Sequence, residues 1–152
     1  MSCRWTAISE APEGVIGQGD SYVASASRPE ALLDFAERVE AGSKWSSAEI
    51  HEMARAVYGT PNRAQIAEAM MAVQGDLSSV VSLLERVLPG ANCHGYDKTP
   101  KLIEAYVSRN CIPAGEKAWM VEGFHPSSPA RALLAATLRA LADAHKNQRT
   151  TP

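Results

Sequence analysis

The spacing of apolar residues changes twice along this chain, and these changes constrain its fold more than any other feature. Between Leu32 and Leu88, apolar residues recur three or four positions apart, as on one face of a helix. From Lys101 to Arg109 they alternate with polar residues, as in a half-buried strand, and after Ser128 the helical spacing returns. This order predicts an α+β fold with several N-terminal helices, a short antiparallel sheet, and a C-terminal helix packed on it in α-β-α layering.

Capping signals divide the N-terminal part into separate helices. A Ser followed three residues later by Glu has the spacing of a capping box, in which each side chain satisfies a backbone N–H of the other. Gly42 and Gly59 fit the C-terminal ends of the first two helices, and Pro61 fits the first position of the third. Met70 in the third helix and Leu77 in the fourth are expected on buried faces. Four starts are expected: Ser27 with Glu30, Ser46 with Glu49, Thr60 with Pro61, and Asp76.

Three short segments are expected to form the sheet. Lys101–Arg109 has the clearest alternation, Ala118–Glu122 follows a turn at 110–116, and Ala91–Asp97 is a third candidate that Gly95 weakens. The last helix is expected to start at Ser128-Pro129, and its many alanines would let it approach the sheet closely. Its expected buried face consists of Leu133, Ala136, Thr137, Ala140 and Leu141.

The chain reads as one domain with two appendages. Residues 1–26 suggest an arm or a small hairpin, 27–145 a single α+β domain, and 146–152 a polar tail. The 152 residues are enough to bury a core without disulfides or metals. No signal peptide or membrane span is visible, and three cysteines give no disulfide framework, so a cytoplasmic location is expected.

Four segments resemble parts of a known family. The stretch from Gly75 to Gly90 is similar to the opening helix of the phage ABA sandwich domain family, and Ser128–Leu134 is similar to its closing helix. Leu32–Glu40 and Ser46–Gly59 resemble the leading helices of the same proteins, while residues 91–94 lack the tryptophans that the family often places there. The resemblance implies α-β-α layering and a phage or prophage origin, hence a bacterial host cytosol. It implies no activity and therefore no catalytic residues.

No group of residues has the pattern of a catalytic or metal site. Cys93 and His94 are neighbours, and on a strand their side chains would point to opposite faces. The four histidines and three cysteines lack the close spacings of structural zinc sites. Glu49 and Glu52 flank His51, but no second histidine lies four residues from it. We therefore expect no catalytic residue, no metal and no cofactor.

Nucleic-acid binding is also not expected. The formal net charge is −2, whereas proteins that clamp phosphates carry a basic excess. Residues 62–88 could be drawn as helix-turn-helix, but the second helix would offer only Arg86 as a cation. Gly14–Gly19 is glycine-rich but lacks the lysine of a P-loop.

The strand at 101–109 suggests a binding surface. Ile103, Ala105 and Val107 have the pattern of a core face, so Glu104, Tyr106 and Ser108 would occupy the other face. Interfaces favour tyrosine and tryptophan, so Tyr106 and Glu104, with Trp119, form the hypothetical partner-binding site. The alternative is that another element covers this face and Tyr106 belongs to the core.

These observations favour a non-enzymatic accessory protein of phage or prophage type. It would bind a host or phage protein stoichiometrically, and the target could be a component of host defence. The alternative is a small-ligand or nucleotide-binding domain with a pocket between sheet and helices. A third hypothesis is that the protein is an enzyme that uses the thiol of Cys93 or Cys111. The sequence leaves the identity of the partner and the oligomeric state open.

Overall fold

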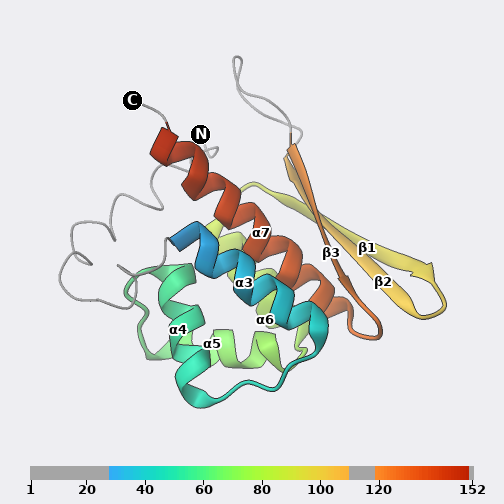
Figure 1. Cartoon of the computed structure of the whole chain (residues 1–152), viewed down its shortest axis with the longest axis horizontal. Coiled ribbons are helices and arrows are strands. Elements are labelled where there is room, and N and C mark those ends of the chain that lie inside the picture. The colour runs from blue at the N-terminus through green and yellow to red at the C-terminus, as the bar shows by residue number, and fades with distance from the viewer. Residues whose placement is uncertain (1–27, 110–118, 151–152) are drawn as a thin grey trace.

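The computed structural model describes residues 28–109 and 119–150, with side chains up to Lys146. The expectations for residues 1–27 and for the turn at 110–116 lie outside these ranges. Five helices and three strands follow one another in the described residues (Figure 1). They are α3 (Arg28–Ala41), α4 (Ser47–Tyr58), α5 (Arg63–Val73), α6 (Leu77–Val87), β1 (Asn92–Thr99), β2 (Leu102–Arg109), β3 (Trp119–His125) and α7 (Pro129–Thr150).

The three strands form one antiparallel sheet in the order β1-β2-β3. The register places Tyr106 opposite His94 on β1 and opposite Glu122 on β3. Helix α7 packs against β2 and β3, and α3 packs against α7 on its other side (Figure 1). The predicted α+β fold, with the C-terminal helix on an antiparallel sheet, is confirmed. The described helices all lie on one side of the sheet, so the second helical layer of the expected α-β-α arrangement is not found among them (Figure 1).

Helix α7 is buried around most of its circumference. Its expected buried face is buried, but so are Ala132, Leu134, Ala135 and Leu138, because the helix lies between the sheet and α3. A helix enclosed on several sides needs apolar side chains all round, and the alanines supply them with little bulk. The helix also continues to Thr150, beyond the end expected near residue 145.

Gly123 on β3 allows α7 to lie unusually close to the sheet. A Cβ atom at this position would lie 2.1 Å from the carbonyl oxygen of Ala132 and 2.5 Å from the backbone nitrogen of Ala136. Both distances are far below van der Waals contact, so only glycine fits beneath the helix backbone. The small residues of α7 and Gly123 of β3 therefore allow the backbones of the helix and the strand to pack in direct contact.

A polar clamp joins α3, α7 and β3 beside this contact. The guanidinium of Arg139 on α7 forms two bonds to the carboxylate of Glu40 on α3, the one from Nη2 to Oε1 at 2.7 Å. The backbone N–H of Phe124 donates to the same carboxylate at 2.8 Å, and Arg139 also donates to the carbonyl of Glu122 at 3.1 Å. β3 is an edge strand, and the N–H groups on the outer side of an edge strand have no neighbouring strand to bond. The Glu40 carboxylate accepts one of these N–H groups, that of Phe124.

The described helix starts after α3 follow the expected caps with one exception, and the cap expected at Ser27 lies outside the described residues. Ser46 and Glu49 form the predicted capping box, and Asp76 accepts the N–H of Ser79 at 3.0 Å. The predicted start of the third helix was wrong, because α5 begins after Asn62 rather than at Thr60-Pro61. The Asn62 side chain accepts the N–H of Gln65 at 2.8 Å, and Gln65 returns the bond to the N–H of Asn62 at 3.0 Å. This reciprocal pair satisfies two donors, which Thr60 would not do.

Two expected core residues are exposed instead. Met70 is 39 % exposed, because the buried side of α5 consists of Ala69, Ala72 and Val73. Leu77 is 48 % exposed at the first position of α6, one turn before Val80 begins the buried stripe.

Replacing Gly123 by alanine should strongly destabilise the fold. The new methyl group would overlap the backbone of α7, and neither element can yield without disturbing the core. We expect a loss of about 3 kcal/mol or more in the free energy of unfolding, measured by urea denaturation. Gly95→Ala is the matched control on β1, where the nearest atom to a Cβ is the Glu104 carbonyl oxygen at 3.2 Å. A smaller loss for Gly123→Ala than for Gly95→Ala would contradict the close-packing argument.

The buried imidazole of His145 should make stability depend on pH. Burial, and secondarily the charge of Arg28, lower its pKa from 6.5 to about 4. As the pH falls, the His145 imidazole of the unfolded chain binds a proton before that of the folded protein does. The contribution of His145 to the free energy of unfolding is therefore complete above about pH 6.5 and is lost between about pH 6.5 and 4. The full effect is about 3 kcal/mol.

The measurement is the free energy of unfolding across this pH range for the wild type and for His145→Leu. We expect a flatter profile in the variant, although His125, whose pKa is also lowered by burial, leaves some slope in both. His51→Leu changes an exposed histidine and is the control. Identical profiles for the wild type and His145→Leu would refute the assignment.

Candidate functional site

The sheet has two unlike faces, and the strand register assigns each residue to one of them. Residues directly opposite each other on paired strands share a face. On the face toward α7, Cys93, Ile103, Trp119 and Val121 pack against the hydrophobic core. The other face is covered by none of the described helices, and we call it the open face (Figure 1). The register places on it Asn92, His94, Tyr96, Glu104, Tyr106, Ser108, Met120, Glu122 and Phe124, and Lys98 belongs to it through its contacts with Glu104 and Phe124.

The structure brings together two of the three residues predicted to bind a partner. Glu104 and Tyr106 lie two residues apart on β2 and both belong to the open face. Trp119 pairs with Arg109, shares its face, and packs against the core on the side of α7. It therefore cannot contribute to a surface formed by Tyr106 and Glu104. Glu104 itself is only 1 % exposed, since neighbouring side chains of the open face cover it.

Aromatic rings from all three strands gather on the open face. The ring of His94 stacks on Tyr106 with centroids 4.9 Å apart, and Tyr96 stacks on Tyr106 at 6.0 Å. On the other side of Glu104, the ammonium group of Lys98 lies 5.4 Å from the centroid of Phe124. Met120 adds an apolar side chain that is 60 % exposed. His94 and Tyr96 were not predicted, although their spacing of two residues in the weakest expected strand was a signal for them.

The hydroxyl groups of two tyrosines form a chain that ends on Glu104. The hydroxyl of Tyr96 donates to Glu104 Oε1 at 2.7 Å and lies 3.2 Å from the hydroxyl of Tyr106. A tyrosine hydroxyl has a single proton, and that of Tyr96 is used on Glu104. The hydroxyl of Tyr106 is therefore the donor to Tyr96.

The carboxyl group of Glu104 is charged and only partly satisfied. The hydrogen bond from Tyr96 is the main reason that its pKa lies below the ordinary value, with Tyr106, Glu122 and Lys98 acting in the same direction against burial. Lys98 Nζ lies 3.6 Å from Oε1. Oε2 is buried and has no hydrogen-bond donor among the described residues. A buried acceptor without a donor costs free energy, which makes Oε2 the least satisfied polar atom of the open face.

The pair Cys93 and His94 does not form a nucleophile and base. The two side chains lie on opposite faces of β1, since Cys93 packs against the core while His94 stacks on Tyr106. Burial, and secondarily the charge of Glu85, raise the pKa of the Cys93 thiol. A raised pKa lowers the fraction of thiolate, which is the reactive form. Cys3 and Cys111 lie outside the described residues.

Two other histidines are engaged in local structure. His125 Nδ1 accepts the backbone N–H groups of Ser127 and Ser128, at 3.1 and 2.9 Å, in the turn that leads into α7. On α4, His51 Nδ1 lies 2.8 Å from the carbonyl oxygen of Ser47. Within residues 28–109 and 119–146, no three His, Cys, Asp or Glu side chains come together as a metal site would require.

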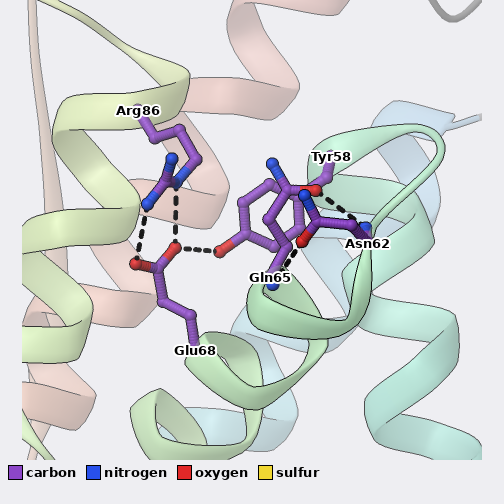
Figure 2. A network of polar contacts seen from close by, with 5 residues as sticks. All are labelled: Tyr58, Asn62, Gln65, Glu68 and Arg86. Carbon is purple, nitrogen blue, oxygen red and sulfur yellow. Dashed lines mark hydrogen bonds and ion pairs between the residues drawn. The ribbon is translucent and has the colours of Figure 1, made fainter.

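Arg86, the cation that a helix-turn-helix would have offered to DNA, is bound within the helical layer, which is formed by α4, α5 and α6. Arg86 on α6 donates two hydrogen bonds to Glu68 on α5, at 3.2 and 3.3 Å (Figure 2). The hydroxyl of Tyr58 on α4 donates to the same carboxylate at 2.5 Å, as Figure 2 shows beside the Asn62–Gln65 capping pair. Burial, and secondarily the bond to Glu68, raise the pKa of Tyr58. The network joins three helices and uses the donors that a recognition helix would direct at DNA.

A shallow hollow beside β3 does not suit a phosphate. The described residues that line it include three acids, Glu40, Glu122 and Asp143, and a single cation, Arg139, which is held by Glu40. Phosphate sites need several donors or cations that are free for the ligand. No helix within the described ranges has the length and apolar character that a membrane span requires.

Comparisons with models of known protein families, with curated proteins and with solved structures found no match.

Replacing Tyr96 by phenylalanine should raise the pKa of Glu104. The substitution removes the hydrogen bond that most lowers this pKa and keeps the aromatic ring. The measurement is an NMR pH titration of the Glu104 side-chain carboxyl carbon. Tyr106→Phe should raise the same pKa by less, while Tyr58→Phe, in the helical layer, should leave it unchanged. An unaltered Glu104 titration in Tyr96→Phe would contradict the proposed chain of hydroxyl groups.

Proposed function

We propose that this protein acts without catalysis, by stoichiometric binding of another protein through the open face. The observation that carries the proposal is the set of aromatic and apolar side chains on a sheet face that the described helices leave uncovered. Tyrosine and methionine are enriched at the centres of protein interfaces, where a few such residues supply most of the binding energy. Exposed groups of apolar residues on a soluble domain often mark such surfaces.

Exposed apolar side chains on the helices are the competing candidate for a binding surface. They belong to Met70 and Met71 on α5 and to Leu77 at the start of α6. The open face is the better candidate, because its rings are fixed by stacking and by the hydroxyl chain to Glu104. Side chains that are already ordered lose less entropy when a partner binds.

The biological setting of the proposal comes from the family resemblance. The similarity of residues 75–90 and 128–134 to the phage ABA sandwich domain family supports a phage or prophage accessory protein in a bacterial cytosol. A component of host defence is the target that we propose on this basis. This part is an analogy, and the binding surface does not depend on it.

Two exposed methionines on different surfaces allow a matched test. Met120 lies on the open face and is 60 % exposed, and Met71 lies on α5 and is 44 % exposed. After a partner is captured and identified, calorimetry with the two purified proteins should give a stoichiometry near one. We expect Met120→Lys to weaken the dissociation constant at least about tenfold, and Tyr106→Ala to do the same. Met71→Lys should change it by less than about twofold.

Thermal unfolding of each variant separates a binding effect from a folding effect. Tyr106→Ala removes ring contacts as well as a binding group, whereas Met120→Lys changes an exposed side chain and should leave stability unchanged. Binding that is abolished by Met71→Lys but unaffected by Met120→Lys would place the interface on the helical layer and overturn the proposal.

A further inference from the structure

We propose that the open face recognises an arginine side chain of the partner, which displaces Lys98 and binds the carboxylate of Glu104. This inference rests on the proposed function and names the chemistry of the group that is bound. It starts from Glu104 Oε2, a buried, charged acceptor that receives no hydrogen bond from the described residues. A cation with several donors is the group that best satisfies such an atom.

The surroundings of Glu104 favour a planar cation. Tyr106, stacked with His94 and Tyr96, lies on one side along the sheet, and Phe124 lies directly opposite Glu104 on β3. A guanidinium group can bind a carboxylate through two parallel bonds while its plane rests on an aromatic ring. Glu122, which lies opposite Tyr106 on β3, is exposed and carries another carboxyl group of the open face.

Lys98 already shows that this place accepts a cation. Its ammonium group lies 3.6 Å from Glu104 Oε1 and 5.4 Å from the centre of the Phe124 ring, so it makes both kinds of contact that the partner's group would make. It leaves Oε2 without a donor, and an ammonium group lacks the two parallel, coplanar donors with which a guanidinium binds both oxygens of a carboxylate.

Lys98 is also placed to be displaced. Its side chain is 50 % exposed, whereas that of Glu104 is 1 % exposed. Lys98 lies where the pairing of β1 with β2 shifts register between Asp97 and Thr99, and bulges of this kind redirect side chains. An ion pair with one exposed partner contributes little free energy. The free energy gained from a bidentate arginine–carboxylate pair can therefore exceed the free energy lost when the Lys98–Glu104 pair breaks.

The test uses the full chain labelled with ¹⁵N and two short synthetic peptides as probes. One peptide carries a single arginine between glycine and serine residues, and the other carries citrulline, which is neutral but has the same shape, at that position. We expect the arginine peptide to shift the backbone amide signals of His94, Tyr96, Glu104, Tyr106 and Phe124. The citrulline peptide should bind at least about tenfold more weakly.

Three variants separate the proposed site from general charge attraction. Glu104→Gln should abolish the preference for arginine over citrulline, whereas Glu122→Gln, on the same face, should reduce arginine binding by less than about threefold. Lys98→Ala removes the competing cation from an exposed position, so it should fold normally and bind the arginine peptide more tightly. Thermal unfolding of each variant verifies folding.

Equal binding of the two peptides, shifts confined to another surface, or unchanged affinity in Lys98→Ala would each overturn the arginine site. Failure of this site is distinguishable from failure of the proposed function, because the latter is tested with the purified partner and Met120→Lys. If Met120→Lys weakens the partner but the arginine peptide does not bind, the open face is an interface that does not recognise arginine.

Discussion

The close approach of α7 to β3 at Gly123 is the contact on which the rest of the structure depends. Because the backbone of α7 lies directly against β3, the alanines of α7 can contact the sheet on one side and α3 on the other. The same approach brings Arg139 within reach of Glu40 and of the carbonyl of Glu122, so the polar clamp closes beside the apolar contact. Without a glycine at this strand position the layers would separate, and the clamp would lose its geometry.

One central helix that covers one face of a small sheet leaves the other face to be stabilised by its own side chains. The open face does so with stacked rings and with a chain of hydroxyl groups that ends on Glu104. The carboxyl group stays charged in spite of its burial, because the bond from Tyr96 and nearby polar groups outweigh desolvation. Such an arrangement orders the side chains of the open face in the free protein. The groups that could have suggested catalysis or DNA binding, Cys93 and Arg86, are directed into the core or into the helical layer.

Local signals in the sequence were sufficient for much of the fold. The capping box at Ser46, the cap at Asp76, the strand at 102–109 and the helix that starts at Pro129 were all predicted, because each depends on residues within a few positions of one another. Where two local signals competed, as at Thr60-Pro61 and Asn62, the better hydrogen-bonded one prevailed. Which face of α5 and α6 would be buried depended on distant elements, so Met70 and Leu77 were misplaced.

For the candidate site, the sequence by itself determined that Glu104 and Tyr106 share a face of a strand, because side chains alternate along any strand. It could not determine that Trp119 lies on the opposite face, since a shift of one residue in register exchanges the faces of the whole strand. Nor could it show that His94, Tyr96, Lys98 and Phe124 surround Glu104, because they come from other positions in the sheet and meet only through its pairing. Only the tertiary structure decided which face α7 would cover, and therefore which residues remained to form a surface.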